Sequence, residues 1–116
     1  MDVITQGGEW RLRVGSAAPT DRYVPSADRM FKSAAAAAGS RTIGVILTGM
    51  GDDGTEGARA IRNAGGVVLA ESQETAVVFG MPGAAIAAGL AERIVPLSAV
   101  AGSLIQMIGK TRSDNA

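Results

Sequence analysis

Three short apolar runs alternate with segments of helical periodicity along the chain. The runs 42–48 and 67–70 consist mainly of β-branched and aliphatic residues without polar alternation, which is typical of strands buried on both faces of a parallel sheet. A third run, 93–95, predicts one more short strand. The pattern therefore predicts three parallel strands, each followed by a helical segment.

Four segments have the residue spacing of helices. The first opens at Pro25 and Ser26 and contains a run of five alanines that Gly39 follows; proline suits a first helical turn and glycine a helix end. We expect helices over 25–38, 55–64 and 82–88, and a last helix that Ser98 caps and that gives way to a frayed polar tail at about Lys110. The last helix has one apolar face, formed by Leu97, Val100, Ala101, Leu104, Ile105 and Ile108.

The first 24 residues look irregular except for one strand. Residues 9–14 alternate polar and apolar, with Trp10, Leu12 and Val14 on one side. This period predicts a strand whose apolar side is buried and whose other side faces water.

Alternation of strands and helices predicts the fold class. Strands joined through helices form a parallel sheet with right-handed crossovers and helices on both faces. We therefore expect one domain over 1–116, an α/β fold with a doubly wound, Rossmann-like, three-layer architecture. Alanine and glycine together supply 37 of the 116 residues, so the layers are expected to pack closely. Stability is expected to be marginal unless another segment covers an apolar face.

Composition excludes several classes of function. The chain has no His and no Cys, so it cannot complete a Ser-His-Asp or Cys-His catalyst by itself, nor form a disulfide or a thiolate metal site. Eleven basic residues balance eleven acidic ones, which argues against binding to nucleic acid or to an anionic membrane through bulk charge. No apolar run is long enough to span a membrane. We expect a cytoplasmic protein without membrane insertion.

Residues 49–54 match the pattern G-x-G-x-x-G between an expected strand and an expected helix. Glu71 follows at the distance of the acid that binds the ribose in dinucleotide sites. Against that interpretation, Asp52, Asp53 and Glu56 would repel a pyrophosphate, and the turn contains no basic residue to offset them.

Three other roles remain open for these acids. One aspartate, with Asp52 the stronger candidate, could cap the following helix. One could be held ionised to orient a histidine in acyl transfer. Asp52, Asp53 and Glu56 could also bind Mg²⁺.

Three ordered motifs resemble one known family. They are VILTGMGDDG at 45–54, VVFGMP at 77–82 and RYVPSADRMF at 22–31. Together they resemble the catalytic domain of the chemotaxis protein-glutamate methylesterases, the CheB family, from about Trp10 to Ile108. The segment 22–31 could also merely start a helix, and 77–82 could merely pack in the core.

The resemblance implies a fold, an activity and a set of site residues. The family domain is a doubly wound α/β fold that hydrolyses glutamate methyl esters on chemoreceptors through a Ser-His-Asp triad, and many members also deamidate receptor glutamines. It implies that Asp53, not Asp52, is the triad acid, and that no metal or organic cofactor is needed. The residues implied to contribute to an oxyanion site or to line the active site are Met50, Gly51, Phe79, Met81 and Pro82.

The chain departs from the family pattern in what it lacks. The family's Ser and His lie N-terminal to the motifs seen here, and a receiver domain lies further upstream; this chain has no His and no G-x-S-x-G-like turn. The resemblance therefore implies the C-terminal part of a methylesterase domain, inactive alone. Its expected partners are chemoreceptors, the missing N-terminal part and the receiver domain. The alternative is a non-catalytic α/β remnant that serves binding or structure.

Overall fold

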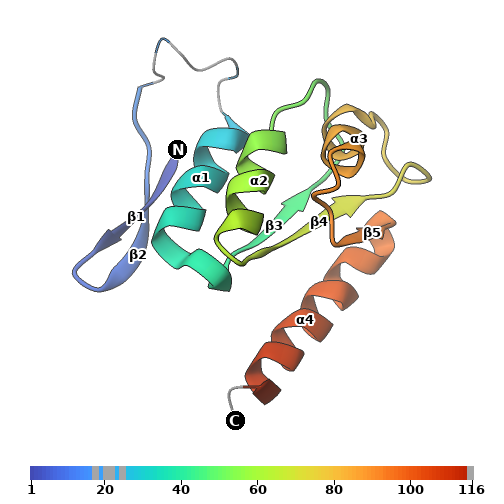
Figure 1. The fold of residues 1–116 in the computed structure, drawn as a ribbon. Helices are drawn as coiled ribbons and strands as arrows, with labels where there is room; N and C mark the ends of the chain where they lie inside the picture. The colour runs from blue at the N-terminus through green and yellow to red at the C-terminus, as the bar shows by residue number, and fades with distance from the viewer. Residues whose placement is uncertain (17–18, 20–22, 24–25, 115–116) are drawn as a thin grey trace.

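The computed structural model of the chain describes residues 1–16, 19, 23 and 26–114 (Figure 1). Its elements in chain order are β1 (Asp2–Gln6), β2 (Glu9–Arg13), α1 (Ala27–Ala38), the 3-10 turn η1 (Gly39–Arg41), β3 (Ile43–Ile46), α2 (Thr55–Asn63), β4 (Val67–Glu71), α3 (Gly80–Ala87), β5 (Arg93–Val95), the 3-10 turn η2 (Leu97–Ala99) and α4 (Val100–Asp114). Arg22, Val24 and Pro25, which belong to the motif at 22–31 and include the expected start of the first helix, lie outside the described residues.

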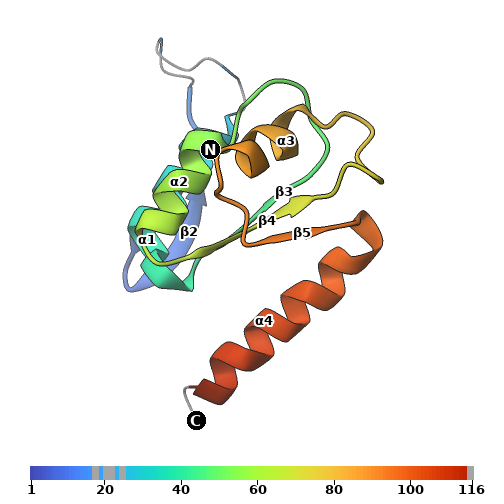
Figure 2. The same cartoon turned by 45° about the vertical axis from the view of Figure 1, so that its right-hand side comes forward.

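The central sheet has the order β3-β4-β5, and both pairs of strands are parallel. Figures 1 and 2 place α1, α2 and α3 on one side of these strands and α4 on the other. The predicted α/β architecture, with a parallel sheet between helices, is therefore confirmed.

The core lies between the sheet and the helices α1 to α3. Three of its seven buried side chains are alanines, and the set is Ala35, Ile46, Ala58, Ile61, Val68, Ala85 and Leu90. The helices α1 and α2 pack closely at Gly57, where an added Cβ would lie 2.5 Å from the Phe31 Cβ and 3.0 Å from the Asp28 Cα. Small residues thus permit the close packing that the composition predicted.

The central strand β4 and the edge strand β3 differ in how completely they are buried. In β4, Val68 and Leu69 point to opposite faces and both are inaccessible to solvent. In β3, Gly44 and Ile46 are buried toward the helices, but Val45 is only half-buried and Leu47 is exposed. The prediction that this strand is buried on both faces is therefore wrong for the face toward α4, because α4 packs chiefly against η2.

The N-terminus forms a hairpin of which the sequence predicted only one strand. β1 pairs antiparallel with β2 through a turn at Gly7 and Gly8, whose φ angles of 61° and 81° favour glycine. The predicted apolar side of the second strand is not buried, since Trp10, Leu12 and Val14 are all exposed. The reason is that α1 packs against β1 rather than β2.

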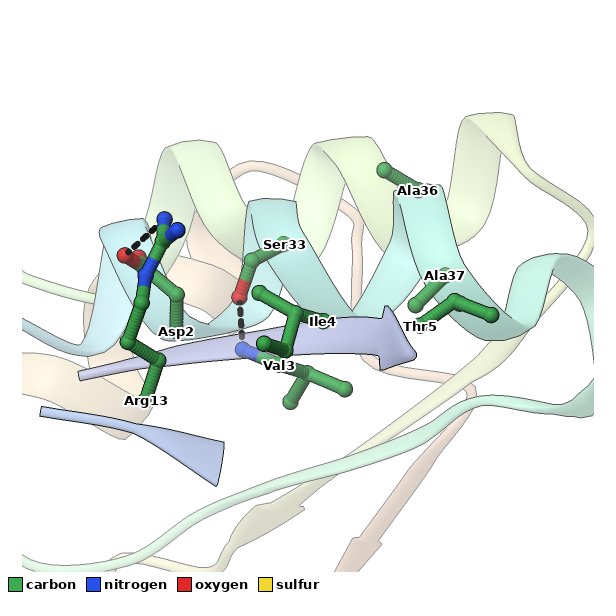
Figure 3. A pocket seen from close by; sticks show the side chains of 8 residues that line it. All are labelled: Asp2, Val3, Ile4, Thr5, Arg13, Ser33, Ala36 and Ala37. Atoms are coloured by element: carbon green, nitrogen blue, oxygen red, sulfur yellow. Dashed lines mark hydrogen bonds and ion pairs between the residues drawn. The ribbon is translucent and has the colours of Figure 1, made fainter. Parts of the chain in front are cut away.

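A shallow cavity of about 450 Å³ lies between β1 and α1 (Figure 3). The backbone N–H of Val3 donates to the Ser33 Oγ at 2.7 Å across this junction, and Arg13 pairs with Asp2 at its rim. None of the predicted site residues lines this cavity.

Most helix boundaries agree with the predictions. Ser26 caps α1, because its Oγ accepts the N–H of Arg29 at 3.2 Å, and Gly39 ends it. α3 starts at Gly80, two residues earlier than predicted, with Pro82 still in its first turn.

The last helix differs more. Ser98 lies in the 3-10 turn η2 and does not cap α4, and the expected frayed tail is wrong because α4 continues to Asp114. Leu97, Ile105 and Ile108 of the predicted apolar face are exposed. No helix in the described part of the chain is both long and apolar enough to cross a membrane.

Candidate functional site

Two segments that are 30 residues apart form one unit at the carboxyl ends of β3 and β4. The Thr48 Oγ1 accepts the N–H of Val78 at 2.7 Å and donates to its carbonyl at 3.1 Å. The N–H of Gly49 donates to the Val78 carbonyl, and the N–H of Met81 donates to the Gly49 carbonyl, each at 2.9 Å. The structure thus brings together the two motifs around 45–54 and 77–82, where open α/β sheets bind ligands.

Glycines in this unit are required by geometry. Gly51 and Gly54 have φ angles of 76° and 97°, which side chains disfavour. At Gly80 an added Cβ would lie 2.9 Å from both the Gly49 carbonyl oxygen and the Gly51 nitrogen. Gly51 and Gly54 therefore shape this turn, and Gly80 lets the second loop pack on it.

Asp53 is nearly buried, with 6% of its surface exposed. Its Oδ2 accepts the N–H of Ala27 at 2.7 Å, and its Oδ1 accepts the N–H of Asp28 at 2.9 Å. The carboxylate thus satisfies two of the first N–H groups of α1, where a helix favours negative charge. A carboxylate has about four acceptor sites, so these two bonds fix its orientation and leave capacity for a further donor.

Asp28 makes the reciprocal contact. Its Oδ1 accepts the N–H groups of Gly54 and Gly57 at 2.9 and 2.8 Å and so caps α2. Each helix is therefore capped by an aspartate of the other helix's N-terminal region. This role was not predicted from the sequence, where the only signal for it is the acid in the motif 22–31.

Asp52 does not cap α2, so that prediction is wrong. The N-cap position belongs to Gly54 and has no side-chain cap from its own turn. Asp52 is exposed, and its Oδ1 accepts the Tyr23 hydroxyl at 3.1 Å. The left-handed turn at Gly51 and Gly54 directs the two neighbouring acids differently, one to the surface and one to the α1 N-terminus.

The two alternative uses of the acids find no support in the geometry. Glu71 is 2% exposed, and both of its carboxylate oxygens accept hydrogen bonds inside the protein, so it is not available to bind a ribose. Among the described residues, no three acidic side chains lie close enough to hold a metal ion, so Asp52, Asp53 and Glu56 do not converge.

The implied lining residues are at different depths. Met50 and Gly51 are exposed on the turn, and no acceptor in the described part of the chain binds the Met50 N–H. Phe79 and Met81 are half-buried, and Met81 packs against the core. Pro82 is fully buried, which agrees with core packing for that part of the motif.

Comparison with known proteins places these features in a family. The family model for CheB methylesterase matches residues 2–104. The chain is 46% identical over 112 residues to protein-glutamate methylesterase/protein-glutamine glutaminase 1 of Myxococcus xanthus, covering 97% of this chain and 32% of that protein. It is 53% identical over 104 residues to methylesterase/glutaminase 3 of Geobacter sulfurreducens, covering 90% of this chain and 28% of that protein.

A solved structure agrees with the sequence relatives. The Thermotoga maritima CheB methylesterase catalytic domain superposes with a TM-score of 0.87 at 38% identity, covering 91% of this chain and 56% of that one. The chain thus spans about a third of the length of these curated relatives and just over half of the solved domain. Because the family model spans most of the chain and the relatives and the solved domain agree with it, the chain belongs to the CheB methylesterase family.

Proposed function

We propose that this chain is the C-terminal part of a CheB-type methylesterase domain and supplies the aspartate of its Ser-His-Asp triad. The observation that carries the proposal is Asp53, held by two N–H groups of α1 in the turn at the carboxyl end of β3. An acid fixed in this way is suited to orient a histidine. Asp52, which faces solvent, is not.

The proposed reaction is acyl transfer from a glutamate methyl ester of a chemoreceptor. A serine oxygen from the N-terminal part attacks the ester carbonyl, methanol leaves, and water hydrolyses the acyl-enzyme. Asp53 accepts the Nδ1–H of the histidine and stabilises the imidazolium that forms. The backbone N–H of the exposed Met50 would donate to the developing oxyanion. Receptor glutamines would react by the same steps with loss of ammonia.

The N-terminal part of the domain is proposed to dock at the open edge of β3. In the described structure β3 pairs only with β4, so a row of backbone groups faces outward there. Leu47, Val77 and Val78 expose apolar surface at the same end of the sheet. The Thermotoga maritima domain contains a further stretch of chain, since this chain covers 56% of it. A receiver domain would act on the site from further upstream.

The second candidate is a non-catalytic remnant of the domain. What favours it is the absence of His from the chain, which leaves this chain with one triad member. The two candidate functions differ in one outcome, which is whether the site hydrolyses the ester once the serine and histidine of the triad are supplied.

The deciding experiment uses a chimera, the Geobacter sulfurreducens relative in which this chain replaces the matching residues. We expect the chimera to release methanol from methylated receptor within about tenfold of the parent rate, and the 116-residue chain alone to give only background, because removal of triad members costs orders of magnitude. A folded chimera without activity would support the remnant. Activity of the chain alone would overturn the proposal that the serine and histidine come from the N-terminal part of the domain.

A further inference from the structure

Glu71 is a buried carboxylate that the proposed triad does not use. It ends β4 with 2% of its surface exposed, and no ion pair with a residue in the described part of the chain neutralises it. Burying a charged group without a counter-ion is costly unless hydrogen bonds compensate. The hydrogen bonds that Glu71 accepts therefore indicate what it is for.

Glu71 ties together the segments that follow all three parallel strands. Its Oε1 accepts the backbone N–H of Thr48, just after β3, at 2.9 Å. Its Oε2 accepts the hydroxyl of Thr75, in the loop after β4, at 2.8 Å. The same hydroxyl accepts the N–H of Leu97, just after β5, at 2.9 Å. One carboxylate thus fixes the ends of three strands relative to one another.

Thr48 links Glu71 to the site through hydrogen bonds. Its Oγ1 holds both the N–H and the carbonyl of Val78, so the residue that Glu71 binds is the residue that holds the second loop. Met50 follows Thr48 by two residues, and Phe79 follows Val78 by one. A shift of Thr48 would therefore displace both the proposed oxyanion donor and the lining loop.

We propose that Glu71 is a positioning residue of the site, which sets the turn 48–54 relative to the loop 76–80 through its hydrogen bonds to Thr48 and Thr75. The proposal rests on the proposed function for its catalytic consequence, but not for the clamp itself. Glu71 does not touch the substrate. It acts on the site through Thr48, and the hydrogen bonds rather than the negative charge are what the site requires.

Hydrogen exchange tests the clamp without any need for activity. In the chimera, Glu71→Met keeps the length of the side chain and removes both acceptors. We expect amides in 48–49 and 78–81 to exchange about tenfold faster or more, while those of β4 and α2 stay within about twofold. Unchanged exchange in 48–49 and 78–81, or equal acceleration throughout the domain, would overturn the clamp.

Steady-state kinetics of the same proteins test its consequence. Glu71→Met should lower kcat about tenfold or more with KM within about twofold, because small displacements of catalytic groups cost rate rather than binding. Glu71→Gln retains an acceptor for Thr48 and can donate to Thr75, so it should remain within about threefold of the parent kcat. A Glu71→Gln variant as slow as Glu71→Met would show that charge, not hydrogen bonding, matters, and would overturn the proposal.

Two further variants protect the test against a folding failure. Thr75→Val removes the hydroxyl of an exposed residue from the same network and should change exchange and kcat in the same direction by a smaller factor. Glu74→Gln is the matched control, since it removes a charge from an exposed neighbour and should change neither. If the parent chimera is inactive, the proposed function fails, while the exchange measurements still decide whether Glu71 positions the two loops.

Discussion

The two sides of the parallel sheet differ in how completely this chain covers them. On the side of α1 to α3, Ile46, Ile61 and Val68 are buried in a continuous core. On the side of α4, Ile105 is 71% exposed and Ile108 half exposed. The covered side holds the anchored Asp53, and it is built wholly from this chain. The difference shows that the side bearing the site has a packed core, whereas apolar side chains on the side of α4 are left exposed.

The largest expected effect concerns the acid on the covered side. In the chimera, Asp53→Asn should lower kcat roughly 10²–10⁴-fold, because the amide cannot stabilise an imidazolium as the carboxylate does. Asp52→Asn should stay near the parent rate, since Asp52 is exposed. Methanol release by each variant is the measurement.

A thermal melt of both variants separates catalysis from folding. Asn at position 53 turns an amide group toward one of the two N–H groups that the carboxylate accepts, so some loss of stability is expected as well. A slow Asp52→Asn with a near-normal Asp53→Asn would reverse the assignment of the triad acid.

A pair of isoleucine truncations compares the two sides directly. Ile61→Ala should destabilise the chain by about 2–5 kcal/mol, because Ile61 is inaccessible to solvent and leaves a cavity. Ile105→Ala should cost less than about 0.5 kcal/mol in the chain alone, as for an exposed site. Denaturant unfolding of the 116-residue chain measures both. Equal costs would show that α4 is packed in solution and would remove the contrast between the sides.

Self-association should also originate on the α4 side. The exposed apolar residues of α4 and the open edge of β3 predict that the isolated chain associates with itself. Ile105→Glu should shift the sedimentation profile toward monomer, and Lys32→Glu, on the exposed surface of α1, serves as the control. A compact, cooperative monomer from the unaltered chain would contradict the prediction.

The reciprocal caps give a smaller effect on the covered side. Asp28→Ala removes the acceptor of the Gly54 and Gly57 N–H groups, both in buried residues, and should cost about 1–3 kcal/mol. Glu56→Gln, which changes an exposed side chain in the first turn of α2, should cost much less. Thermal unfolding of the three proteins measures the difference, and equal melting temperatures for Asp28→Ala and the parent would show that water replaces the cap.

The smallest expected effect is on pH dependence at the hairpin. Hydrogen bonds from Arg29, and secondarily from Arg13, lower the pKa of Asp2 in the folded chain. A carboxyl whose pKa is lower in the folded chain stabilises the fold at pH values above its unfolded pKa of about 4. This stabilisation is lost as the pH falls through the folded-state pKa. The stability difference between the parent and Asp2→Asn should therefore be present at pH 7 and shrink below about pH 4. Added salt should reduce it at neutral pH, and a difference constant with pH would argue against the ion pairs.

Local patterns predicted most of the fold. The strands β3, β4 and β5 and the helices α1 and α2 lie close to their predicted ranges because apolar runs, caps and glycines act within a few residues. β1 was missed although Gly7 and Gly8 mark its hairpin turn, because its own residues carry only a short apolar run. The exposure of Trp10 could not be predicted, since it depends on which strand α1 covers.

The sequence by itself determined the parallel α/β order, the glycine turn and, through its resemblance, the family and the implied role of Asp53. Only the tertiary structure decided which acid is anchored, because Asp28 and Asp53 are 25 residues apart and meet only when α1 and α2 pack together. It likewise turned Glu71 inward to Thr48, 23 residues away, rather than toward a ligand. Periodicity encodes which face of an element is apolar, but the partner of a polar side chain is set by packing between elements that lie far apart in sequence.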